Sequence, residues 1–211
     1  MKVLITAGPT REPIDDVRFI SNRSSGQIGL ALADAADAAG HEVTLLLGPV
    51  VAPATLADRI TVRRFTTTAD LEKLLTACFP NCDLLIMAAA VADYRVAKAI
   101  AGKTERQKAL KIELEGTPDL VAGVAQTKRD DQKIVAFALE EPHQLEDRAV
   151  AKMKRKGVDA IVANPLVTME EQGIAGVYLT SNGERDEPGT MSKSDFARWL
   201  IDRIGLHKAE G

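Results

Sequence analysis

Long apolar runs alternate along the chain with segments of helical periodicity. These runs contain few polar positions and are typical of strands buried on both faces. They are KVLIT (2–6), EVTLLLG (42–48), DLLIMAAA (83–90), KIVAFAL (133–139) and DAIVANP (159–165), with a shorter run at ITVRRF (60–65). Helices are predicted over Gln27–Ala39, Ala69–Phe79, Pro118–Lys128 and Leu145–Lys156. Because strands that alternate with helices pair in parallel through right-handed crossovers, the pattern predicts an α/β fold with a doubly wound, Rossmann-like, mostly parallel sheet.

Two segments depart from this alternation. ALKIELEG (109–116) alternates with period two and is predicted to be a half-exposed strand, and GVYLTSNGERDEPG (176–189) contains an Asn-Gly pair typical of a tight hairpin. Together they predict a small antiparallel appendage. The last periodic segment, Ser192–Ile204, begins with a residue suited to a helix N-cap and is predicted to close the domain as a surface helix.

Length and composition indicate one ordinary globular domain. The chain has 211 residues, of which 45% are hydrophobic and 27% charged, and a domain usually takes roughly 100 to 200 residues, so residues 1–211 are expected to form a single domain. The net charge of −3 argues against binding to nucleic acid through a general positive field. Cys78 and Cys82 lack the spacing of a zinc or redox motif. No apolar run has the ~20 residues of a membrane span and no targeting segment is evident, so a soluble, cytoplasmic protein is expected.

The first candidate site follows the first predicted strand. The stretch AGPTREPIDDVRFISNRSSGQIG (7–29) is far longer than the few residues that usually join a strand to a helix. Ligands of open α/β sheets bind beyond the carboxyl ends of the strands, where this loop is expected to lie. Ser25 and Gly26 precede a helix whose exposed amides could hold phosphate. The alternative is a capped helix that packs closely at Gly29.

Other charged residues also suggest an anion site. Lys152 and Lys156 are four residues apart and share one face of a predicted helix, where their mutual repulsion would be relieved by a bound polyanion. They would equally suit a solvated helix C-terminus. Asp93 follows a strand, where a carboxylate could meet Mg²⁺. Lys103 lies in a polar segment of the kind that forms mobile loops.

A nicotinamide-dependent dehydrogenase of the short-chain type is the principal alternative to the family described below. Tyr94 and Lys98 have the Tyr-x-x-x-Lys spacing of such enzymes. However, no serine occurs between Ser25 and Ser181 to complete that catalytic set, and the first turn lacks the expected glycine spacing. A catalytically silent nucleotide-binding module is the third possibility.

Four motifs together resemble the phosphopantothenate–cysteine ligase family of coenzyme A biosynthesis. They are ITAGPTREPIDDVRFISNRSSGQIG, AAAVADYR, PDLVAGVA and IVAFALE, in the family's order. The resemblance implies an enzyme that joins 4'-phosphopantothenate to L-cysteine through an acyl-nucleotide. It also implies CTP as co-substrate, Mg²⁺ as cofactor and a homodimer. Dimerisation would cover the exposed strand edges of the appendage. The sequence leaves the choice between CTP and ATP open.

The resemblance also assigns roles to individual residues. Asn22 matches the family's asparagine at the acyl-nucleotide, Arg18 the nearby arginine and Lys103 the lysine that acts on the phosphates. Asp93 is also the candidate for a Mg²⁺ contact, direct or through water. The nucleotide-binding matches are Gly8, Ser25, Gly26, Ala89, Ala90, Asp93, Pro118, Asp119, Leu120, Val121, Phe137, Lys152 and Lys156.

The chain departs from the family pattern in three respects. Many relatives continue the catalytic lysine as Lys-Ile-Lys-Lys, whereas this chain reads KTER from Lys103. The usual FAAET reads FALEE from Phe137, which could alter the edge of the base pocket. Many bacterial members also carry a flavin-dependent decarboxylase domain, which is absent from the 211 residues. The chain is therefore expected to be either a stand-alone ligase or one domain of a bifunctional enzyme.

Overall fold

A computed structural model describes residues 1–50, 56–106, 108–165 and 173–205. Within them, the main sheet has eight strands in the order β13-β12-β10-β9-β6-β1-β4-β5. The strands from β10 to β5 are parallel, and β12 and β13 extend the sheet in antiparallel fashion. This confirms the predicted fold class. The strands are β1 (Lys2–Ala7), β4 (Glu42–Leu47), β5 (Thr61–Arg64), β6 (Leu84–Met87), β9 (Lys133–Glu140), β10 (Ala160–Pro165), β12 (Val177–Thr180) and β13 (Arg185–Asp186).

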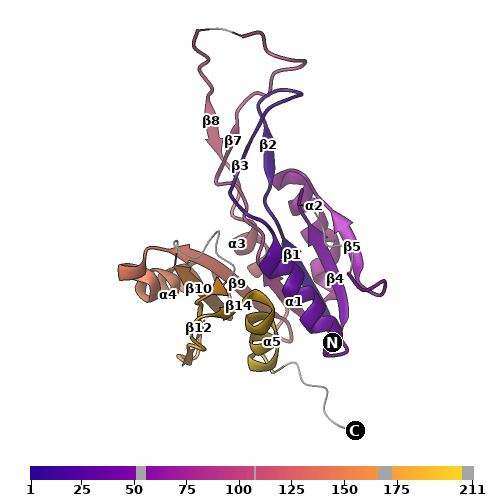
Figure 1. Cartoon of the computed structure of the whole chain (residues 1–211), viewed down its shortest axis with the longest axis vertical. Coiled ribbons are helices and arrows are strands. Elements are labelled where there is room, and N and C mark those ends of the chain that lie inside the picture. The colour runs from indigo at the N-terminus through magenta and orange to yellow at the C-terminus, as the bar shows by residue number, and fades with distance from the viewer. Residues whose placement is uncertain (51–55, 107, 166–172, 206–211) are drawn as a thin grey trace.

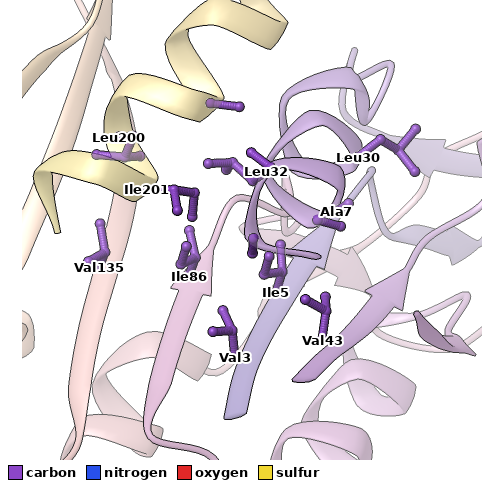
Figure 2. Packing of buried hydrophobic residues seen from close by; sticks show 14 of the residues in the cluster. Val3, Ile5, Ala7, Leu30, Leu32, Val43, Ile86, Val135, Leu200 and Ile201 are labelled. Atoms are coloured by element: carbon purple, nitrogen blue, oxygen red, sulfur yellow. The ribbon is translucent and has the colours of Figure 1, made fainter. Parts of the chain in front are cut away.

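Helices cover both faces of the sheet because its central strands are apolar on both sides. Along β1, Val3 and Ile5 point into one hydrophobic cluster and Leu4 into another. The first cluster lies under α1 (Gln27–Ala38) and α5 (Lys193–Arg203), as Figure 2 shows for Leu200 and Ile201 of α5. The second lies under α2 (Thr68–Cys78), α3 (Leu120–Ala125) and α4 (Leu145–Lys156), with the short 3₁₀ helices η1 (Phe79–Asn81) and η2 (Pro142–Gln144) before β6 and α4. None of the described helices is long and apolar enough to cross a membrane.

Two antiparallel strand pairs project from the sheet as an arm (Figure 1). We use this term for the hairpin of β2 (Arg11–Pro13) and β3 (Phe19–Ser21) together with the segment from β7 (Tyr94–Val96) to β8 (Leu114–Gly116). Backbone hydrogen bonds join the two parts: the Ile100 amide donates to the Ile14 carbonyl at 2.9 Å. The predicted long loop after β1 therefore contains a hairpin of its own.

The two segments of the predicted antiparallel appendage lie in different sheets. Of the expected strand 109–116, Leu114–Gly116 forms β8, which pairs with the equally short β7. The segment 176–189 forms the expected hairpin, but its first strand, β12, pairs with β10 at the edge of the main sheet. A further short pair, β11 (Gly173–Ile174) with β14 (Met191–Ser192), leads into α5. The N-cap prediction is confirmed, since the Ser192 side chain accepts a hydrogen bond from the Asp195 amide.

Gly29 allows α1 to pack closely on β1, and its replacement tests that contact. A Cβ at this position would lie 2.4 Å from the Ala7 Cβ and 2.9 Å from the Ala7 Cα. We expect Gly29→Ala to lower the free energy of unfolding by about 1–3 kcal/mol, because overpacking outweighs the gain in helix propensity. Denaturant unfolding measures this change.

Gly123→Ala is the matched control, since Gly123 also lies in a helix but a Cβ there would meet nothing within 4 Å. We expect this variant to be neutral or stabilised by up to about 1 kcal/mol. Equal effects of the two substitutions would contradict the close contact between α1 and β1.

Candidate functional site

A cleft of about 730 Å³ lies where the loops following the central strands meet. It has contributions from both helical layers, since α1 and α5 border it on one side and α3 and α4 on the other. This is the position at which open α/β sheets bind ligands. Its lining residues fall in the segments 21–28, 87–93, 117–121 and 136–139, together with Lys152, Arg155, Lys156, Ile161, Asn164, Ile174 and Lys193.

The start of α1 offers backbone amides to the cleft. Gly26 caps this helix in the left-handed conformation, with φ of 71°, and no side chain caps it. A Cβ on Gly26 would lie 3.2 Å from the backbone of Gly8, so the turn needs glycine there. The first turn of α1 contains no acidic residue. Its positive end is therefore available to an anion.

Asn22 joins the loop after β1 to the loop after β6. Its side-chain Nδ2 donates to the Val91 carbonyl at 3.0 Å and to the Ala90 carbonyl at 3.3 Å. The Thr10 amide also donates to the Ala90 carbonyl, at 3.2 Å, so the same two loops are joined by their backbones. The carboxamide of Asn22 thus has a fixed orientation at the cleft, beside the backbone of residues 89–91.

Two lysines of α4 form the opposite wall, and each has an acidic partner. Lys156 Nζ lies 2.8 Å from Asp119 Oδ1, and Lys152 Nζ lies 2.5 Å from Glu140 Oε1. Partial burial raises the pKa of Asp119, but hydrogen bonds from Lys156 and the Ala122 amide outweigh it and hold that pKa below its ordinary value. Glu140 is only 3% exposed, so it needs its cationic partner. Carboxylates therefore set the positions of both lysines on the cleft wall.

Asp93 is the candidate for contact with a metal ion. Its carbonyl accepts a hydrogen bond from the Thr117 amide at 3.0 Å, which holds its segment against the start of the 117–121 segment. No group of three or more His, Cys, Asp or Glu side chains in the described part of the chain could hold a metal ion. Mg²⁺ is commonly bound by one or two carboxylates together with substrate phosphates and water, and Asp93 fits that role.

The structure brings most of the predicted site residues to one cleft. Those that line it are Asn22, Ser25, Gly26, Ala89, Ala90, Asp93, Pro118, Asp119, Leu120, Val121, Phe137, Lys152 and Lys156. Gly8 lies behind Gly26 and supports the turn instead.

Arg18 and Lys103 lie elsewhere, on the arm. Arg18 Nη2 donates to the Thr104 carbonyl at 2.7 Å and is also 2.7 Å from Asp15 Oδ2. Hydrogen bonds led by that from the Val17 amide hold the pKa of Asp15 well below its ordinary value, so this carboxylate stays charged and keeps Arg18 in place. The structure therefore keeps Arg18 next to the segment containing Lys103, and neither residue lines the cleft of its own chain.

Sequence reasoning missed several lining residues. Asn164 is the next-to-last residue of β10 and lines the cleft, and its Oδ1 is a buried acceptor without a hydrogen-bond partner among the described residues. Lys193 starts α5 and reaches the cleft from the face opposite α4. The position of Asn164 at the carboxyl end of a predicted strand was a usable signal, whereas Lys193 belongs to no motif that the pattern revealed.

The dehydrogenase alternative receives no support. Tyr94 lies on β7 with 60% of its surface exposed, and neither Tyr94 nor Lys98 lines the cleft. The two residues belong to the arm, where they cannot act on a ligand held over the strand ends of the same chain.

Comparison with known proteins shows the family to which this chain is similar. A family model described as the DNA/pantothenate metabolism flavoprotein C-terminal domain matches residues 1–206. The chain is 45% identical over 166 residues to a protein named cysteine/cysteine sulfinic acid decarboxylase from an unknown prokaryotic organism. It is 41% identical over 178 residues to the coenzyme A biosynthesis bifunctional protein CoaBC of Escherichia coli (strain K12). These alignments cover 78% and 82% of this chain but 46% and 43% of the relatives, so the chain spans about half the length of the curated relatives it matches.

Solved structures agree with this result. The C-terminal domain of CoaBC superposes with a TM-score of 0.82 at 33% identity, over 97% of this chain and 94% of that one. A Cab2 mutant in complex with phosphopantothenate-cysteine gives a TM-score of 0.78 at 20% identity, over 96% of this chain and 84% of that one, which shows a shared fold.

Proposed function

Because this chain belongs to the family of DNA/pantothenate metabolism flavoprotein C-terminal domains, we propose that it joins 4'-phosphopantothenate to L-cysteine through an acyl-nucleotide intermediate. The relatives named CoaBC and the solved complex with phosphopantothenate-cysteine support this reaction. One observation carries the proposal: a single cleft holds Asn22 on one side and the Lys152–Lys156 pair on the other. An acyl group and a nucleotide can therefore meet within it.

The first step activates a carboxylate, which is otherwise unreactive toward an amine. A carboxylate oxygen of phosphopantothenate attacks the α-phosphorus of the nucleotide, and pyrophosphate leaves. Negative charge then develops on phosphate oxygens, where Lys152, Lys156 and the amides at the start of α1 would stabilise it. Mg²⁺ bound with the nucleotide would neutralise further phosphate charge, with Asp93 as its protein ligand.

The second step forms the amide. The amino group of cysteine attacks the acyl carbon, the bond from that carbon to the bridging oxygen breaks, and CMP leaves with the oxygen. Asn22, which is fixed by its hydrogen bonds to the Ala90 and Val91 carbonyls, would hold the acyl group still during this attack. The side chain of Phe137, which lines the cleft, would contact the nucleotide base. We take CTP as the preferred nucleotide and the cytoplasm as the site of the reaction.

The arm leads us to propose a homodimer. Most of the exposed large apolar side chains among the described residues belong to it, the others being Met1 and Val62. Exposed apolar patches of this kind mark interfaces, and a second copy of the chain is the partner we propose. In such a dimer the arm would carry Lys103 and Arg18 to the cleft of the partner subunit. The arm residues concerned are Val17, Phe19, Tyr94, Ile100, Leu110, Ile112 and Leu114.

Pyrophosphate release tests the activity directly. With phosphopantothenate, Mg²⁺ and no cysteine, we expect CTP to release about one equivalent of pyrophosphate per cleft, because the acyl-nucleotide stays bound until an amine arrives. Addition of cysteine should start turnover. UTP, GTP and ATP serve as the comparison nucleotides. Absence of phosphopantothenate-dependent pyrophosphate with all four would refute the ligase activity, and faster release with ATP would reverse the nucleotide preference.

Lys103 and Asn22 are expected to act in different steps. Lys103→Ala should slow pyrophosphate release by about 10² to 10³, because one preorganised stabilising charge is lost from the first step. Asn22→Asp should still release about one equivalent, but the second step should fail, because a carboxylate then faces the Ala90 and Val91 carbonyls in place of an amide donor. Quenched reactions with labelled phosphopantothenate measure the intermediate. Equal amounts in both variants would show that the two residues do not divide the steps in this way.

Mixing these two inactive variants tests whether the arm acts on the partner subunit. If it does, a mixed dimer has one cleft with intact Asn22 that receives an intact Lys103. An equal mixture should then regain about a quarter of wild-type activity, since half of the dimers are mixed and each has one complete cleft. If Lys103 serves its own cleft, no mixed dimer is complete. Native mass spectrometry should confirm subunit exchange, and exchange without recovered activity would contradict the arrangement.

A further inference from the structure

Lys193 occupies a defined place at the edge of the cleft. It is the first residue of α5, and the Ser192 Oγ that caps this helix accepts a hydrogen bond from the Asp195 amide at 3.1 Å. Just before it, β14 pairs with β11, whose Ile174 also lines the cleft. The backbone that carries Lys193 is therefore held by a helix cap on one side and a strand pair on the other.

The positive charge of Lys193 has no acidic partner among the described residues. Its Nζ donates to the neutral Gln27 Oε1 at 3.2 Å, and Gln27 is the first residue of α1. The other two cleft lysines, Lys152 and Lys156, are each paired with a carboxylate. Lys193 differs from them in that the hydrogen-bond partner of its ammonium among the described residues is a neutral side chain.

The electrostatic surroundings of Lys193 favour an anion from outside the chain. A cation at the first position of a helix is opposed by the helix dipole. The ammonium also lies beside the start of α1, a second positive helix end with no acidic residue in its first turn. Both features are unfavourable in the free protein, and an anionic group bound in the cleft would relieve both.

The geometry points to Lys193 as a phosphate-binding residue of the cleft, holding a phosphate group against the start of α1. This inference rests on the proposed function, in which two substrates carry phosphate, the nucleotide and phosphopantothenate. Lys152 and Lys156 reach the cleft from the face of α3 and α4, and Lys193 reaches it from the face of α1 and α5. Phosphate held over the strand ends is thus contacted by cations from both helical layers.

Calorimetric titration of the full chain with Mg²⁺·CTP, and separately with phosphopantothenate, tests the assignment. Lys193→Met removes the charge and retains an unbranched side chain that is only one atom shorter. We expect it to raise the Kd of one ligand by about tenfold or more, as for the loss of one charge-assisted hydrogen bond, and to leave the other within about twofold. The ligand affected identifies which substrate supplies the phosphate. Lys193→Arg should restore most of the lost affinity, and the Kd of Lys193→Met should depend less on ionic strength than that of the wild type.

Arg198→Ala is the matched control on the same helix, because Arg198 pairs with Asp195 and does not line the cleft. It should change neither Kd. If the wild type binds both ligands and Lys193→Met binds them equally well, the inference is wrong and Lys193 only links α5 to α1 through Gln27. A loss that Lys193→Arg does not recover would also overturn it. If the wild type binds neither ligand, the proposed function itself fails, and the inference fails with it.

Discussion

The site depends on a set of hydrogen bonds that continues the pairing of β1 with β6 beyond the ends of both strands. The Ala90 amide donates to the Gly8 carbonyl at 3.0 Å, and the Thr10 amide donates back to the Ala90 carbonyl at 3.2 Å. Two fully buried hydroxyls complete the contact, since Thr6 Oγ1 and Thr10 Oγ1 accept from the amides of residues 89 and 92, both at 3.0 Å. The two loops are thereby fixed as one unit, and Asn22 is oriented on that unit.

A buried carboxylate gives the base of the arm a similarly fixed place. Glu12 is only 3% exposed, and its Oε1 accepts hydrogen bonds from the Thr68 amide at 2.8 Å and the Thr68 hydroxyl at 2.7 Å. A charge buried to this extent requires such bonds, so β2 is held against the start of α2. Beyond this anchor the arm extends away from the main sheet (Figure 1). After β3 the chain passes through Asn22 to the start of α1.

The sequence predicted those parts of the protein that have strong local patterns. The buried strands were evident from their apolar runs, and the boundaries of α4 were predicted correctly because its periodicity is uninterrupted between Leu145 and Lys156. The arm was predicted only in part, since β8 lies within the expected strand 109–116, whereas β2, β3 and β7 are too short to have a period and are defined by their pairing. The position of the 176–189 hairpin in the main sheet was also not predicted, because its pairing with β10 depends on tertiary structure. Lys193 had no local signal, since it becomes a cleft residue only through the packing of α5 on α1.

In the proposed reaction, this cleft activates a carboxylate by linking it to the α-phosphorus of a nucleotide. The most direct measurement uses phosphopantothenate labelled with ¹⁸O in both carboxylate oxygens, turned over with CTP, Mg²⁺ and cysteine. If the reaction runs through an acyl-nucleotide, the isolated CMP carries one ¹⁸O atom while the amide retains the other, because the bridging oxygen leaves with the nucleotide. Release of CDP and of ¹⁸O-labelled inorganic phosphate, with no labelled CMP, would contradict this, since the carboxylate would then have been activated as an acyl phosphate.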